Sequence, residues 1–263
     1  MHKGKVTAPS LRAMKASGER IVCVTCYDYP SAQMAEAAGI DVLLIGDSLG
    51  NVLLGYESTI PVELEDIAYH TRAVKRGTHR AMVLADLPFG SYQVNADQAV
   101  ESSIYLMKQG AEAVKLEGEE YEAIERISQA GIPVMGHLGF TPQSVHSFGG
   151  HKVQGRDDSR AEQILEAAKQ IEESGAIALV LELVPAELAR RISEALSIPT
   201  IGIGAGVHCD GQVQVWHDVL GMSERKLRHA NAYMNGRSDM VSALTQLSTE
   251  VRSGQFPTEE NSF

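Results

Sequence analysis

Short apolar runs alternate with amphipathic segments along most of the chain. The runs are rich in Val, Ile and Leu, and most lack the apolar–polar alternation of a strand with one wet face. That composition is typical of strands buried on both faces, as in a parallel sheet. The pattern therefore predicts parallel strands over 21–26, 41–46, 80–85, 112–117, 132–137, 176–182 and 198–204.

The segments between these runs have the apolar spacing of amphipathic helices. In 62–76, Ile67, Thr71 and Val74 fall on one face, whereas Lys75 lies away from it. Asn95 is the expected cap of the next such segment, because its side chain can accept a hydrogen bond from the first helical turn. The same spacing predicts helices over 97–109, 120–130, 159–174, 186–196 and 238–252.

An eighth strand is expected in 212–221, although that stretch also suits a helix. Eight β/α units in about 250 residues match the (β/α)8 barrel, with an open doubly wound sheet as the alternative. No linker or repeat interrupts the pattern, so we predict one α/β barrel domain over 1–263 with an N-terminal extension. The connections 47–61 and 138–158 are long, and loops of that length usually carry function.

Composition narrows the classes of protein. Of the 263 residues, 44% are hydrophobic and 22% are charged, as in globular chains. The net charge of −11 argues against a nucleic acid or an anionic membrane surface as the main partner. No apolar run reaches the roughly 18 residues of a membrane span, and the N-terminus lacks a signal-peptide core. A cytoplasmic location is therefore expected.

Cysteine and glycine motifs add little chemistry. Cys23 and Cys26 form a C-x-x-C inside a β-branched run rather than at a helix start, and Cys209 alone is too little to complete a zinc site. We interpret all three as reduced thiols, the first two within a strand. The GIGAG segment at 202–206 lacks the dinucleotide-binding spacing and predicts a tight turn at a strand end.

Ionisable side chains stand at the C-terminal ends of five successive runs. In a parallel barrel these ends form one mouth, where active sites lie. A single charged residue there is often only the start of a solvated loop, but several together converge on one place. We therefore expect the active site to contain Asp47, Asp86, Lys115, Glu117, His137 and Glu182.

The carboxylates in this set suggest a metal site. Asp47, Asp86 and Glu117 would repel one another in a small volume unless a cation were present. Oxygen ligands without Cys or His favour Mg²⁺ over Zn²⁺. Lys115 lies two residues before Glu117, so both side chains point to the same side of a strand. In an apolar setting Lys115 must find an anionic partner or lose its charge. The open alternatives are an electrostatic clamp, a Schiff-base lysine and a plain ion pair with a barrel carboxylate.

Long segments of the chain resemble the ketopantoate hydroxymethyltransferase family. The resemblance runs in order from about residue 8 to the C-terminus. It rests on segments such as VLLIGDSLGNVLLGYESTIPV, VLADLPFGSY, AVKLEG, VMGHLGFTPQS, GGHKVQGR, LVLELVP, IGIGAG and SGQFPTEENSF. One departure, SERKLRH at 223–229, replaces a segment that is usually Pro-Lys-Phe-like, and it concerns contacts near the last helix rather than the core chemistry.

The resemblance implies both a fold and an activity. The fold is a (β/α)8 barrel of the phosphoenolpyruvate/pyruvate type. The activity is transfer of a hydroxymethyl group from 5,10-methylenetetrahydrofolate to 3-methyl-2-oxobutanoate in pantothenate biosynthesis, with Mg²⁺ as cofactor. The implied partners are these small molecules and further copies of the chain, because family members are commonly homodecamers.

The resemblance also implies a role for each candidate residue. These roles are metal and substrate binding by Asp47 and Asp86, an additional metal contact by Glu117, oxoacid contacts by Ser48, Lys115 and His137, and proton abstraction by Glu182. Glu182 ends an apolar run, so its carboxylate is partly desolvated, which suits a general base. Two alternatives stay open: a related Mg²⁺-dependent barrel that cleaves or rearranges a 2-oxoacid without folate, and a non-catalytic barrel that binds a metabolite. The folate contacts, and the roles of His146 and His151, are unassigned.

Overall fold

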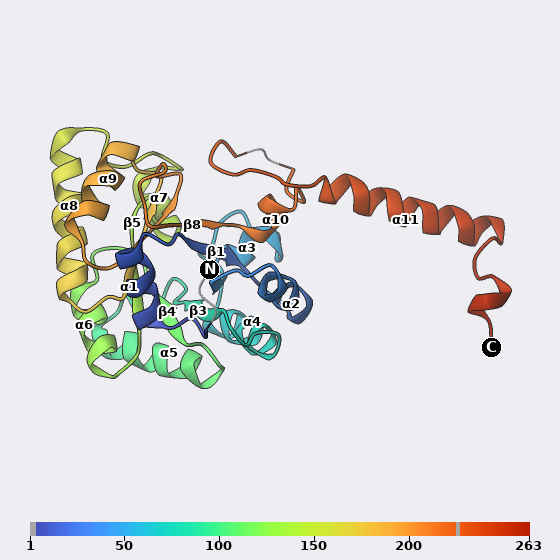
Figure 1. Ribbon diagram of the computed structural model, residues 1–263, viewed down its shortest axis with the longest axis horizontal. Coiled ribbons are helices and arrows are strands. Elements are labelled where there is room, and N and C mark those ends of the chain that lie inside the picture. The colour runs from blue at the N-terminus through green and yellow to red at the C-terminus, as the bar shows by residue number, and fades with distance from the viewer. Residues whose placement is uncertain (1–3, 225–226) are drawn as a thin grey trace. The chain divides into compact units, whose positions relative to one another are not determined.

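The computed structural model describes residues 4–224 and 227–263, and within them eight parallel strands form a closed barrel (Figure 1). The strands pair in chain order, and β8 pairs with β1 to close the barrel. Closure confirms the α/β barrel and excludes the open sheet. The strands are β1 (Ile21–Thr25), β2 (Val42–Ile45), β3 (Met82–Asp86), β4 (Ala113–Lys115), β5 (Val134–Gly139), β6 (Ala178–Glu182), β7 (Thr200–Ile203) and β8 (Gly211–Gln214).

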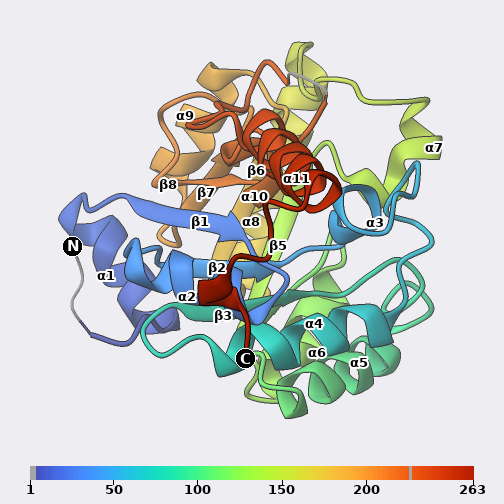
Figure 2. The ribbon, with the colours of Figure 1, turned by 90° about the vertical axis from the view of Figure 1, so that its right-hand side faces the viewer.

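Amphipathic helices cover the outside of the barrel, with α4, α5 and α6 side by side in Figure 2. The Asn95 side chain caps α5 by accepting from the Gln98 N–H, as predicted. The stretch 212–221 holds both a strand and a short helix, which explains its ambiguous pattern. The helices up to this point are α1 (Ala8–Ser17), α2 (Tyr29–Ala37), α3 (Leu49–Val52), α4 (Leu64–Arg76), α5 (Ala96–Lys108), α6 (Tyr121–Gln129), α7 (Val145–Phe148), α8 (Asp158–Glu173), α9 (Ala186–Ala195) and α10 (Trp216–Val219).

Both long connections contain short helices. The first carries α3, and the second carries the 3-10 turn η1 (Pro142–Ser144) followed by α7. The helices α1 and α2 were not predicted, because each is short and begins at a proline-containing cap rather than showing several apolar turns. All three cysteines lie within the described residues as buried free thiols. Cys23 lies in β1 as predicted, whereas Cys26 directly follows the strand, which ends at Thr25.

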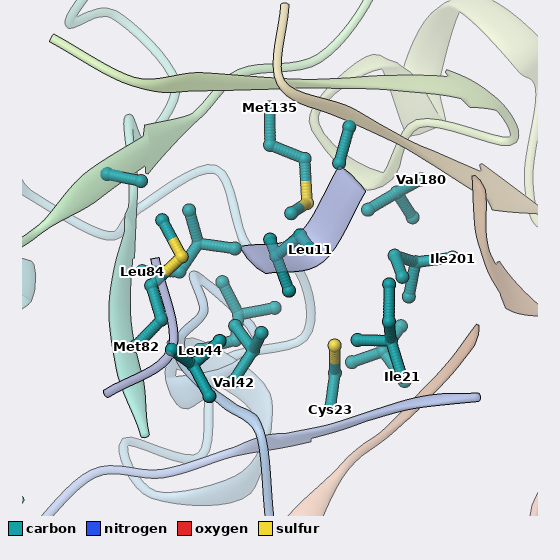
Figure 3. Close-up of a cluster of buried hydrophobic side chains, with 14 of the residues drawn as sticks. Leu11, Ile21, Cys23, Val42, Leu44, Met82, Leu84, Met135, Val180 and Ile201 are labelled. Carbon is teal, nitrogen blue, oxygen red and sulfur yellow. The ribbon is translucent and has the colours of Figure 1, made fainter. Parts of the chain in front are cut away.

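Alternate strand residues fill the inside of the barrel. Figure 3 shows the side chains of Ile21, Val42, Leu84 and Met135 pointing into one cluster. Their partners two residues away, such as Cys23 and Leu44, belong to the same cluster, as the strand period of two requires. The inward face of each strand is therefore known, and this fixes which later residues point into the mouth.

Helix α1 closes one end of this interior. Leu11 and Met14 are buried, and both belong to the barrel cluster together with Val6 (Figure 3). Lys15 extends from the same helix to an ion pair with Asp210 at 2.9 Å, next to the start of β8. The N-terminal segment is thus part of the core of the barrel.

The chain divides into two compact units, and the second comprises Trp216–Phe263. Its main element is α11 (Gly236–Ser253), followed by the 3-10 turn η2 (Glu259–Asn261). Residues 225 and 226 of the unusual SERKLRH segment lie outside the described residues. The assignment of 1–263 to one domain stays a prediction. None of the helices in the described part of the chain combines the length and the apolar character that a membrane crossing requires.

We expect Leu11→Ala to lower the free energy of unfolding by about 2–5 kcal/mol, because it leaves a cavity in the barrel interior. Arg12→Ala on the exposed side of α1 is the matched control, with an expected change within about 0.5 kcal/mol. Urea unfolding of both variants at one protein concentration measures the difference. Equal midpoints for Leu11→Ala and the control would show that α1 does not contribute to the core.

Candidate active site

The inward-facing series of each strand continues at its C-terminal end into polar residues. In three strands a polar residue follows two positions after an inward-facing apolar residue, so it faces the same side. The pairs are Leu84 and Asp86, Met135 and His137, and Val180 and Glu182. In β4 the series Ala113, Lys115, Glu117 has the same spacing, whereas Asp47 and Ser48 follow β2 on a loop. The structure thus brings together Asp47, Ser48, Asp86, Lys115, Glu117, His137 and Glu182.

Lys115 and Asp86 form an ion pair at the centre of this group. They are opposite each other in the β3–β4 register, and Lys115 Nζ lies 2.6 Å from Asp86 Oδ1. The two side chains are only 5% and 2% exposed. The other Asp86 oxygen, Oδ2, accepts the backbone N–H of Asp47 at 3.0 Å. Asp86 therefore connects the β2 loop to the lysine on β4.

Crowding of carboxylates changes their protonation. Burial, followed by the negative charges of Asp86 and Glu117, raises the pKa of Asp47 to about 8. Burial also raises the pKa of Asp86, although Lys115 opposes the shift. Burial alone would lower the pKa of Lys115, but Asp86, Glu117 and Asp47 outweigh it and the pKa is raised. These contacts favour the charged form of Lys115, whereas a lysine activated for Schiff-base formation has a lowered pKa.

His137 lies between two glutamates. Its Nδ1 is 3.4 Å from Glu117 Oε1, and its Nε2 is 3.3 Å from Glu182 Oε2. Burial would lower its pKa, but Glu117 and Glu182 raise it to about 9. Among the described residues neither ring nitrogen has a partner in hydrogen-bond geometry, so the attraction is that of close opposite charges.

Backbone constraints fix the position of Glu182. The next residue, Leu183, has a φ of 47°, a strained conformation for a branched side chain. It is held there because its N–H donates to Ile203 O, and its carbonyl accepts from the Gln154 N–H. On the other side, a Cβ at Gly139 would lie 2.2 Å from the Glu182 carbonyl oxygen. Strain of this kind is typical of functional sites.

Two buried tyrosines and a glutamine belong to the site, and the sequence reasoning missed them. Tyr27 OH lies 2.9 Å from Ser48 Oγ. Tyr92 OH contacts the backbone of Glu117, and Gln143 donates to both Asp47 and Glu117. These residues lie on loops without a repeating pattern, and their only sequence signal is a polar side chain close to a strand end.

The donor set suits a hard divalent cation. Burial raises the pKa of both Asp47 and Asp86, and the negative charge of Glu117 adds to each shift. Glu117 Oε1 is buried without a hydrogen-bond partner among the described residues. Among the described residues, no three His, Cys, Asp or Glu side chains have the spacing of a metal centre. Lys115 contacts Asp86, and Gln143 contacts Asp47. Mg²⁺ needs few protein oxygens and keeps positions for water and substrate.

Residues 5–259 match the ketopantoate hydroxymethyltransferase family. The chain belongs to this family. A 3-methyl-2-oxobutanoate hydroxymethyltransferase of Carboxydothermus hydrogenoformans is 52% identical over 263 residues, which cover 98% of this chain and 95% of the relative. Its counterpart in Chloroflexus aurantiacus is 53% identical over 262 residues, with 98% and 92% covered. The resemblance predicted from the sequence, and with it the class of hydroxymethyltransferases, is confirmed.

Solved structures confirm the fold type. A putative phosphonomutase of Burkholderia cenocepacia has a TM-score of 0.62 at 15% identity, with 94% of this chain and 99% of that chain covered. A 2,3-dimethylmalate lyase of the PEP mutase/isocitrate lyase superfamily has a TM-score of 0.60 at 16% identity, with 97% and 91% covered. At such low identity these structures support the family's barrel and not an activity.

We expect Lys115→Met to lower the free energy of unfolding by about 3–5 kcal/mol in EDTA at pH 8, because it leaves the buried Asp86 carboxylate unpaired. The control is Arg126→Met, which removes an exposed ion pair with Asp97 and is expected to cost at most about 1 kcal/mol. Urea unfolding compares the two variants. Similar losses for both would mean that Asp86 is not held as a buried anion.

Proposed function

We propose that this chain transfers a hydroxymethyl group from 5,10-methylenetetrahydrofolate to 3-methyl-2-oxobutanoate, giving ketopantoate and tetrahydrofolate. One observation carries this proposal: the residues to which the family resemblance gives a role lie together at one mouth of the barrel. They include Asp47, Asp86, Lys115 and Glu182. This placement supports catalysis over a non-catalytic binding role, because a binding barrel has no need of an acidic group beside a buried lysine.

We propose Mg²⁺ as the cofactor, held by Asp47 and Asp86 with Glu117 as an additional contact. The buried Glu117 Oε1 and the mutual repulsion of the carboxylates support this assignment. When bound, Mg²⁺ would polarise the ketone of the oxoacid and stabilise negative charge on its oxygen. Further proposals from the family relationship are a homo-oligomer, expected to be a decamer, and a cytoplasmic location.

The chain's own residues have distinct tasks in the proposed reaction. Ser48, Lys115 and His137 contact the oxoacid beside the metal ligands, and Lys115 adds a fixed positive charge near the enolate oxygen. Glu182 takes the C3 proton and so generates the enolate.

One water supplies the oxygen of the new hydroxyl group. It breaks the two C–N bonds of the folate methylene bridge and releases that carbon as formaldehyde, together with tetrahydrofolate. The enolate carbon adds to this formaldehyde, and the proton held by Glu182 returns to the new hydroxyl oxygen. The loops 47–61 and 138–158 cover the mouth and exclude bulk solvent.

The assay for the proposed activity uses the purified protein, both substrates and Mg²⁺, with ketopantoate as the detected product. We expect EDTA to abolish product formation and Mg²⁺ to restore it. Asp86→Asn should weaken metal binding with little change of circular dichroism, because it removes a charge and keeps the shape. Full activity of the metal-stripped protein would contradict the metal role. Consumption of a 2-oxoacid in the absence of folate, without formation of ketopantoate, would favour the alternative lyase.

A second expected outcome concerns Lys115. Because its pKa is raised, its amine stays protonated and is not a nucleophile. Borohydride added with 3-methyl-2-oxobutanoate should therefore leave the mass of Lys115 unchanged in peptide mapping. A mass increase equal to the reduced oxoacid adduct would establish iminium chemistry instead.

A third expected outcome concerns Glu182. When folate is absent, the protein should exchange the C3 hydrogen of 3-methyl-2-oxobutanoate with D₂O. The reason is that the C3 proton is removed before the enolate forms the new carbon–carbon bond. Glu182→Gln keeps the shape but removes the base, so exchange and turnover should fall together by about 10²–10⁴-fold. NMR of the substrate in D₂O measures the exchange. Exchange at the unmodified rate in the glutamine variant would move the role of base to His137.

A further inference from the structure

We propose that Gln143 is a positioning residue that sets the separation of the Asp47 and Glu117 carboxylates and thereby the affinity of the site for a divalent cation. This inference rests on the proposed metal site. Gln143 lies in η1, directly after β5, and is 4% exposed. None of the roles derived above uses it.

Gln143 joins the ends of four successive strands. Its backbone N–H donates to Glu117 Oε2 at 3.0 Å, beyond β4. Its side-chain Nε2 donates to Asp47 Oδ2 at 2.9 Å, beyond β2, and to the Leu87 carbonyl at 3.0 Å, beyond β3. A residue on the β5 loop thus contacts two proposed metal ligands through two different groups.

The orientation of the amide is fixed by its partners. The Leu87 carbonyl can only accept, so the atom beside it and beside Asp47 is the Nε2 donor. The Oε1 atom accepts from Tyr92 OH at 2.6 Å and from Gln93 Nε2 at 3.2 Å. Tyr92 OH in turn accepts the Glu117 N–H at 3.2 Å, which links the amide back to the same glutamate. The two Nε2 protons are therefore both committed.

Gln143 leaves the second oxygen of each carboxylate outside its own contacts, and for Glu117 this is Oε1, which lies 3.4 Å from His137 Nδ1. Gln143 binds Asp47 Oδ2 and Glu117 Oε2, whereas Glu117 Oε1 has no hydrogen-bond partner among the described residues. Hydrogen bonds that hold the outer oxygens of metal-binding carboxylates orient the inner ones, and losing such a partner typically costs about 10–100-fold in metal affinity. An amide suits the position because it donates to Asp47 without adding another negative charge.

The test measures Mn²⁺ binding to the full chain by calorimetry and by electron paramagnetic resonance of free Mn²⁺. Gln143→Met has nearly the same shape and keeps the backbone N–H, so it removes only the amide. We expect it to weaken Mn²⁺ binding by about 10–100-fold. Its lost turnover should return as Mg²⁺ is raised, whereas general loosening of the fold would not respond to Mg²⁺.

Gln98→Met is the matched control, because the Gln98 side chain also bonds through both amide atoms, but only to the Val94 and Gly90 backbone. It should bind Mn²⁺ as the unmodified chain does. Tyr92→Phe removes the donor to Gln143 Oε1 and should weaken binding by a smaller factor in the same direction.

The outcomes separate the two proposals. If the unmodified chain does not bind Mn²⁺, the proposed metal site is wrong. If it binds and a folded Gln143→Met binds equally well, the role of Gln143 is overturned. If Gln143→Met does not fold, Tyr92→Phe decides, and unmodified affinity in that folded variant overturns the inference.

Discussion

The burial of like charges at one end of the barrel is the constraint on which the site depends. Burial, with a smaller contribution from neighbouring carboxylates, raises the pKa of Asp47 and Asp86, and the paired Lys115 opposes both shifts. Removing such groups from water is costly unless each oxygen finds a partner. Gln143 donates to Asp47 Oδ2 and Glu117 Oε2, and the backbone N–H of Asp47 donates to Asp86 Oδ2. Tyr92 contacts Gln143 and the backbone of Glu117, so it supports this network from outside the charge cluster.

The apolar interior of the barrel offsets the unfavourable free energy of burying this charge cluster. Each strand buries large side chains below the mouth, and α1 closes the opposite end with Leu11 and Met14. A rigid core of this kind can hold a strained residue such as Leu183 and a crowded contact such as Gly139 against Glu182. Packing of the apolar interior therefore stabilises the strained and charged groups at the mouth of the barrel.

Sequence patterns predicted the barrel and the strand-end residues because both depend on local periodicity. Apolar runs gave the strands, and the inward phase of Leu84 or Val180 extends directly to Asp86 or Glu182. The role of α1 in closing the barrel could not be predicted, because the partners of its short apolar face come from strands throughout the barrel. Gln143 was missed for the same reason: its partners lie up to 96 residues away in the chain. The family resemblance named reactive residues but not the side chains that hold them.

The residues of the site are held in two ways, depending on whether they lie in a strand or on a loop. Asp86, Lys115 and Glu182 belong to strands, so their positions are fixed by the barrel hydrogen bonds. Asp47 is one residue out of phase with Leu44 and lies on a loop. It is held there by the Asp86 contact to its N–H, the Gln143 contact to its carboxylate and the Gly50 N–H, which donates to its carbonyl. The loop also turns tightly at Gly46, where a Cβ would lie 2.8 Å from Ser48 Oγ. Under the proposed function, the base and the lysine are therefore positioned by strands, whereas Asp47 depends on contacts of its loop.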